Sequence, residues 1–346
     1  MRMLTTTLLA AAVGLSLLPT ARAADPAPIE IDAQFDPAAA AATAVKASDP
    51  QALKGLKRAA ITQFNVEFVT SDNVSSETSG FAMAGRASVT GYYKLVGVAE
   101  PDFQAIADQL YAGFQQQLQA AGLELVPAAE LAGSPTYRKL QAGGTVLPER
   151  SSNGVTVGPP GMAVYGLNQA QAADGKKGMF AALSGLSAGI SAVGGAMDNM
   201  TLSKELGDAA LLEVSMRVHF AQLTNEAKGF FGRLGSTAKV SAKLHPMVPR
   251  AALTVQSGAY VSVLTLQGPA LLDPAAFVEL REEAATAGDI AGAVAVGLLQ
   301  LASGSKNSHS STKYEAVADA TRYSERVSTG LSQVNALLIA RMVAGR

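Results

Sequence analysis

Apolar and polar residues alternate along four stretches of the chain, 58–70, 87–98, 212–220 and 238–245. A period of two is typical of strands that bury one face and leave the other in water. Such one-sided burial favours antiparallel pairing. We therefore expect a largely antiparallel, half-solvated sheet. The clearest strand, 212–220, has its apolar face at Leu212, Val214, Met216, Val218 and Phe220.

Apolar residues at spacings of three and four predict two long amphipathic helices, over 101–121 and over 320–343. Pro101-Asp102 suits a helix start and Gly122 suits its C-terminal cap. Asp273-Pro274 predicts a further helical region that runs to about Leu301. Strands and helices together give an α+β fold in which amphipathic helices, including a C-terminal one, pack on the sheet.

Residues 1–23 have the pattern of a secretory signal peptide. Arg2 is followed by a short apolar core, and Ala21-Arg22-Ala23 is a small-x-small cleavage site. The alternative is an uncleaved anchor helix. A cleaved signal peptide predicts export to the periplasm, in soluble form or associated with the outer membrane.

The rest of the chain divides into three regions. Residues 24–52 are rich in Ala and Pro and read as a mobile leader. Residues 53–142 spell a strand–strand–helix–strand α/β layer, with 71–86 as a loop. Residues 143–346 form an α+β region that contains a Gly/Ala-rich apolar segment, 178–197, and the C-terminal helix 320–343.

Composition narrows the classes of function. The chain has 346 residues, no cysteine and a formal net charge of −1. Disulfides, thiolate metal sites and cysteine nucleophiles are therefore excluded. A nucleic-acid binder would show a basic excess, so we expect no nucleic-acid partner. Charged residues make up 16% of the chain, below the usual ~25%, and few surface charges suit buried interfaces.

Ser187 is a weak candidate nucleophile because Gly185-Leu186-Ser187-Ala188-Gly189 matches G-x-S-x-G. That motif needs a sharp turn between a buried parallel strand and a helix. The residues before it, Met179 to Leu183, are not β-branched, and the later strands alternate as antiparallel strands do. Small residues packed in a helix explain the match more simply.

His219 and His245 are weak candidate metal ligands, because they could meet if their strands are neighbours. Each falls on the polar face of its strand, so exposure to solvent is the simpler interpretation. No third ligand is suggested by spacing, and we expect neither a metal nor a cofactor.

The uncharged segment 178–197 must be covered by something, because water exposure of so much apolar surface promotes aggregation. It could lie in the core, in a contact with a partner or second copy, or against a membrane. Gly185 and Gly189 are one helical turn apart, a spacing that lets two helix backbones approach closely, and they are the candidate interaction residues.

The helix from Phe103 to Ala121 is followed by Gly122-Leu123-Glu124-Leu125-Val126. With the two strands before it, this block, 58–126, resembles the α/β layer of curli-secretion-channel-type proteins and of TolB amino-terminal domains. The chain departs from that pattern because it has no lipoprotein cysteine. The resemblance implies a role in an envelope assembly and transfers no functional residue.

These observations predict a secreted, non-enzymatic cell-envelope protein that acts by protein–protein contact as an oligomer. One alternative is an outer-membrane pore or secretion-channel component. The other is a periplasmic serine hydrolase that uses Ser187.

Overall fold

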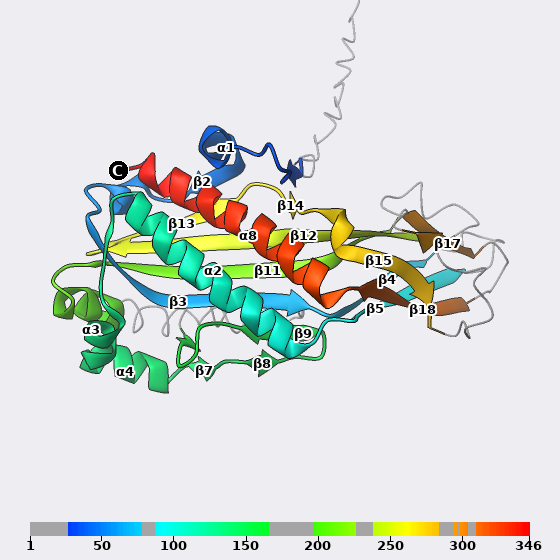
Figure 1. Ribbon diagram of the computed structural model, residues 1–346, viewed down its shortest axis with the longest axis horizontal. Helices are drawn as coiled ribbons and strands as arrows, with labels where there is room; N and C mark the ends of the chain where they lie inside the picture. The colour runs from blue at the N-terminus through cyan, green and yellow to red at the C-terminus, as the bar shows by residue number, and fades with distance from the viewer. Residues whose placement is uncertain are drawn as a thin grey trace, which may run out of the picture.

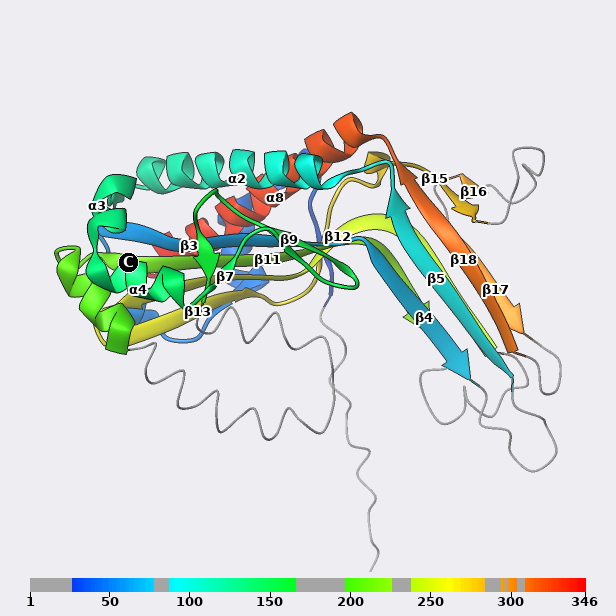
Figure 2. The ribbon, with the colours of Figure 1, turned by 90° about the horizontal axis from the view of Figure 1, so that it is seen from below.

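The computed structural model describes residues 27–77, 87–165, 197–225, 238–283, 294–295, 298–303 and 309–346. They form a body of helices packed on a sheet, from which a β-stranded arm projects at one end (Figures 1 and 2). The α+β class is confirmed. None of the helices in these residues is both long and apolar enough to cross a bilayer.

A mixed sheet of eleven described strands runs through the body in the order β1-β14-β12-β11-β3-β9-β8, with the other strands paired to this path. Most pairs are antiparallel, but β11 runs parallel to β3 at the centre. The sheet comprises β1 (Ile29–Glu30), β2 (Val45–Ala47), β3 (Arg58–Val69), β6 (Glu124–Leu125), β8 (Glu149–Arg150), β9 (Gly154–Val157), β11 (Ala210–Asn225), β12 (Ala238–Ser257), β13 (Tyr260–Leu266), β14 (Ala270–Leu271) and β17 (Leu298–Ser303).

A second sheet forms the arm, in the order β16-β15-β18-β5-β4. Its inner face packs on the ends of β11 and β12 through Val74, Val89 and Val240. Its strands are β4 (Ser71–Glu77), β5 (Ser88–Val96), β15 (Phe277–Glu282), β16 (Val294–Ala295) and β18 (His309–Ala318), and a separate pair joins β7 (Thr145–Val146) to β10 (Ala163–Val164).

Helices α2 (Glu100–Ala120) and α8 (Ala320–Val343) lie side by side on one face of the large sheet (Figure 1). Both match their predicted ranges closely. Phe103 of α2 stacks on Phe68 of β3 and meets Tyr323 of α8 edge-on. The stripe of apolar residues along each helix therefore forms the main core with the sheet.

The opposite face of the sheet carries a smaller core at one end. Leu131 of α3 (Ala128–Gly133) and Tyr137 of α4 (Pro135–Ala142) pack there with Leu202 and Leu206, which lie in and just after a helix over 197–205. The central strands are therefore buried on both faces. The predicted half-solvated pattern is wrong for β3, where Gln63 and Asn65 are also buried.

The described part of the leader, 27–52, is folded, contrary to the mobile segment that composition suggests. β1 pairs with β14, β2 pairs with β13, and α1 (Pro37–Ala44) packs on α8. Asp36 caps α1 by accepting hydrogen bonds from two backbone amides, and the short turn η1 (Pro50–Leu53) then leads into β3. The Ala-rich run provides a small helix face that fits closely against α8, a role that composition alone does not reveal.

Two further predictions are wrong. Residues 71–77 form β4 rather than a loop, and the expected helix after Asp273 is only a short turn, η3 (Pro274–Ala276), followed by β15. In both cases pairing with β5 or β18 determines the structure, and local residue preferences do not.

Candidate functional site

Both candidate histidines are buried, so the expectation that solvent surrounds them is wrong. The exposed fraction is 8% for His219 and 7% for His245. Nε2 of His219 lies 2.9 Å from Oδ2 of Asp72, at the start of β4. Nε2 of His245 donates to the carbonyl oxygen of Leu272 across 2.7 Å.

The strands of the two histidines are neighbours, as the metal hypothesis requires, because β11 pairs with β12. Each Nε2, however, is held by a different partner. Within the described ranges no group of three or more His, Asp and Glu side chains is placed to hold a metal ion. The geometry therefore supplies no third ligand to a His219 and His245 pair.

Ser187, Gly185 and Gly189 lie outside the described residues, as does all of the segment 178–197 except Met197. The nucleophile and close-packing hypotheses at these positions stay predictions.

β3 and β4 follow each other in the chain, and polar side chains of both pair with polar side chains of β11. We call this row of pairs the polar ladder. Its first pairs lie on the sheet face away from α2 and α8, because their apolar neighbours face those helices. The ladder then continues to the base of the arm. Its four pairs are Gln63–Glu213, Asn65–Ser215, Glu67–Arg217 and Asp72–His219.

Hydrogen bonds and charges connect the ladder. Oγ of Ser215 donates to Oδ1 of Asn65 across 3.1 Å. Nε of Arg217 lies 3.5 Å from a carboxylate oxygen of Glu67. Partial burial by itself would raise the pKa of Asp72, but the hydrogen bonds with His219 and with the backbone amide of Asn73, together with the nearby charge of Arg217, lower it. The carboxylate of Asp72 therefore favours its ionised form at the arm end of the ladder.

Glu213 occupies the other, buried end. Its side chain is 7% exposed, and burial raises its pKa to about 7. The adjacent amides of Gln63 and Asn199 oppose this rise by favouring the ionised form, and Nδ2 of Asn199 lies 3.4 Å from Oε1 of Glu213. Glu213 can thus gain or lose a proton near neutral pH, which an exposed glutamate cannot do.

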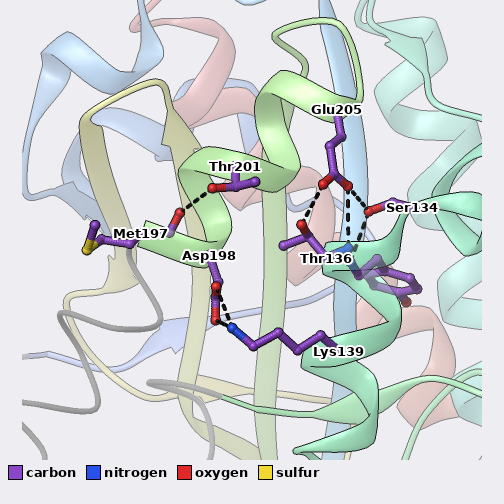
Figure 3. Close-up of polar contacts among 8 residues, drawn as sticks. Ser134, Thr136, Lys139, Met197, Asp198, Thr201 and Glu205 are labelled. Carbon is purple, nitrogen blue, oxygen red and sulfur yellow. Dashed lines mark hydrogen bonds and ion pairs between the residues drawn. The ribbon is translucent and has the colours of Figure 1, made fainter.

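The helix over 197–205 brings Asn199 to this carboxyl group, and polar contacts attach the helix to α4 (Figure 3). Glu205 accepts from Oγ of Ser134 at 2.5 Å and from Oγ1 of Thr136 at 2.6 Å. Lys139 forms an ion pair with Asp198 at 2.9 Å. We call this set the α4 clamp, and it fixes one wall around Glu213.

The outer face of the arm is a second candidate, because it is polar and carries an exposed aromatic side chain. Tyr92 is 47% exposed and pairs with Lys313 of β18. Arg281 bridges to Glu315 at 2.7 Å in the same face. A pocket of about 250 Å³ opens beside them and also reaches Asp72, so it meets the polar ladder at the base of the arm.

Sequence reasoning missed Glu213 and the arm face. Alternation places Glu213 on the polar face of its strand, and nothing local shows that helices cover that face. The exposed Tyr92 was a usable signal, because it falls out of phase with Val89, Tyr93 and Leu95.

Comparisons with protein-family models, with curated proteins and with solved structures found no match.

Proposed function

We propose that this chain is an exported, non-enzymatic protein of the cell envelope that acts by protein–protein contact, and that the outer face of the arm makes the contact. The observation that carries the proposal is the exposed Tyr92, which is set among ion-paired side chains on a sheet that projects from the body (Figure 2). Tyrosine and arginine are enriched in protein interfaces, and tyrosine is a frequent hot spot.

The arm also supports the proposal by its shape. The inner face of the arm joins the main core through residues such as Leu95, Leu280 and Ala316, and Val89 forms a small separate cluster with Val240 of β12, so the outer face of the arm takes no part in either core. A projecting element of this kind places its outer face within reach of a partner or of a second copy.

Site-specific photocrosslinking tests the proposal. A photoreactive phenylalanine analogue replaces Tyr92 in one variant and Tyr260 in the control, in cells that make the protein. Tyr260 is 54% exposed and is the first residue of β13, directly after the turn from β12, which lies at the end of the body away from the arm (Figure 1). We expect one discrete protein adduct from position 92 and none from position 260.

A band of twice the chain mass that contains only this chain would identify a homo-oligomer. Equal labelling at both positions, or none at position 92, would contradict the proposal.

Export is tested by the mature N-terminus. We propose cleavage after Ala23 and recovery from the periplasm or the outer-membrane fraction, which follows from the signal-peptide pattern of residues 1–23. Mass spectrometry of the purified protein should begin at Ala24, and an intact Met1 would contradict export by cleavage.

The two alternatives have separate signatures. A pore or secretion-channel component would stay in the membrane fraction through carbonate washes. A serine hydrolase would react with a fluorophosphonate probe, and Ser187→Ala would abolish the labelling.

A further inference from the structure

A pocket of about 560 Å³ lies between the N-terminal segment, the turn after β14 and the middle of α8. Ile31 and Leu272 give it an apolar wall, and Gly330 lets α8 approach Leu272 closely. Pockets of this size, apolar with a few convergent polar groups, are typical of ligand sites. The ionisable side chains that line it are Glu30, Asp32, His245, Asp273, Glu325 and Arg326.

The rim of the pocket carries an excess of negative charge. Four carboxylates line it, whereas Arg326 is its single guanidinium, already paired with Asp273 at 3.1 Å. Glu30, Asp32 and Glu325 are exposed and come from two elements, the N-terminal segment and α8. A concave surface lined by one sign of charge attracts ligands of the opposite sign.

His245 supplies an independent indication of a ligand. Because its Nε2 donates to the carbonyl oxygen of Leu272, the neutral ring leaves Nδ1 as a hydrogen-bond acceptor. Nδ1 is buried and has no hydrogen-bond partner among the described residues. Burial also lowers the pKa of His245 and so favours this neutral form. A buried acceptor without a donor is rare and costs free energy, which a bound donor would recover.

We propose that this pocket binds an organic cation, whose ammonium or guanidinium group donates a hydrogen bond to Nδ1 of His245 and is neutralised by the carboxylates of the rim. An anion would meet the repulsion of the rim. A neutral donor would satisfy Nδ1 but leave the carboxylates without a counter-charge. The site is separate from the arm face and does not depend on its function.

Calorimetry with matched small probes tests the charge requirement on the mature chain. The probes are n-butylguanidinium and n-butylurea, which share shape and N–H donors but differ in charge. We expect saturable binding of n-butylguanidinium and at least tenfold weaker binding of n-butylurea. A third probe, acetyl-Gly-Arg-Gly-amide, separates the sources of the cation. Tighter binding of this peptide than of n-butylguanidinium indicates a protein side chain, and weaker binding indicates a free small molecule.

Three variants test the residues. The double change Asp32→Asn with Glu325→Gln removes two exposed charges and should weaken n-butylguanidinium binding at least tenfold. His245→Phe replaces the imidazole by a phenyl ring, which has no acceptor at the position of Nδ1. It should weaken binding about tenfold. Glu149→Gln, at the opposite edge of the sheet, is the control and should bind as the parent does.

The proposal is overturned by an absence of binding at 10 mM n-butylguanidinium. It is also overturned by equal binding of n-butylurea, or by unchanged binding in the double variant. The double variant changes only exposed side chains, so it keeps the test valid even if His245→Phe does not fold.

Discussion

At the residue scale, Glu213 shows what the alternation of apolar and polar residues can predict and what it cannot. Alternation correctly places Val214 in the core and Glu213 on the other face of β11. It cannot show that this other face is also covered, because periodicity reports residue types and not what packs on them. The same limit explains why His219 and His245, correctly assigned to polar positions, are buried.

Burial of Glu213 should make stability depend on pH. Its folded pKa of about 7 lies above the ordinary glutamate value of 4.5, so the folded state holds the proton more tightly. The contribution is fully present below pH 4.5, falls as pH rises toward 7 and is lost above it. Glutamine carries no charge at any pH, so Glu213→Gln does not lose this stability as the pH rises. We therefore expect the variant to be more stable than the parent at pH 8, by up to roughly 3 kcal/mol.

Urea unfolding of the parent and of Glu213→Gln at pH 5 and pH 8 measures this effect. The difference between the two proteins should be small at pH 5 and large at pH 8. An equal difference at both values would mean that Glu213 ionises normally in the folded protein.

Adjacent residues of β11 should respond very differently to charge. Val214 is fully buried, so Val214→Asp leaves an unpaired charge in the main core and should cost about 4 kcal/mol or more. Ser215 is half-buried and bonded to Asn65, so Ser215→Asp should cost roughly 1 kcal/mol. Chemical unfolding of both variants checks the ratio, and similar costs would mean that both faces exclude water equally.

At the element scale, the long helices are the features that sequence predicts best. Residues 320–343 form α8 as expected, because a sustained apolar stripe and a capping Asp319 both define it. β4 was missed because Ser, Asn and Asp are typical of loops, and only its pairing with β5 makes it a strand. The arm sheet could not be predicted for the same reason, since its strands come from distant parts of the chain.

The α4 clamp should hold the helix over 197–205 in place. Glu205→Ala removes the acceptor of Ser134 and Thr136, so the backbone amides of 197–205 should exchange hydrogen faster. Lys204→Ala, one residue away on the same helix and exposed, is the matched control and should not change exchange. Mass-spectrometric hydrogen exchange resolves the difference. Equal rates in Glu205→Ala and the parent would show that apolar contacts suffice to dock the helix.

The N-terminal segment should contribute to stability. Removing 24–52 takes away α1, which packs on α8, and β2, which pairs with β13. We therefore expect the melting temperature to fall by roughly 5–10 °C. Removing only 24–28, before β1, should leave it unchanged. Calorimetry of the two truncated proteins and the mature chain makes the comparison. No change in the longer truncation would restore the view of a mobile leader.

At the scale of the whole molecule, sequence predicts the class of the fold but not the division into body and arm. The body follows from two strong helix patterns and the central strands. The arm depends on β4, β5, β15 and β18, which come from segments far apart in the chain and pair only through long-range contacts. The candidate sites share this property, since each joins residues from separated segments.

The described N-terminal segment and the C-terminal helix pack on each other. α1 packs on α8, and Arg341 and Arg346 donate hydrogen bonds to the carbonyl oxygens of Val45 and Ala121. In the chain α8 follows every described strand, so until α8 has been synthesised the sheet lacks one of the two long helices that cover this face. Because Val327, Leu331 and Leu338 of α8 belong to the main core, that core is incomplete before α8 is present. For a protein exported as proposed, this order of segments would keep the main core from closing until α8 has crossed the membrane.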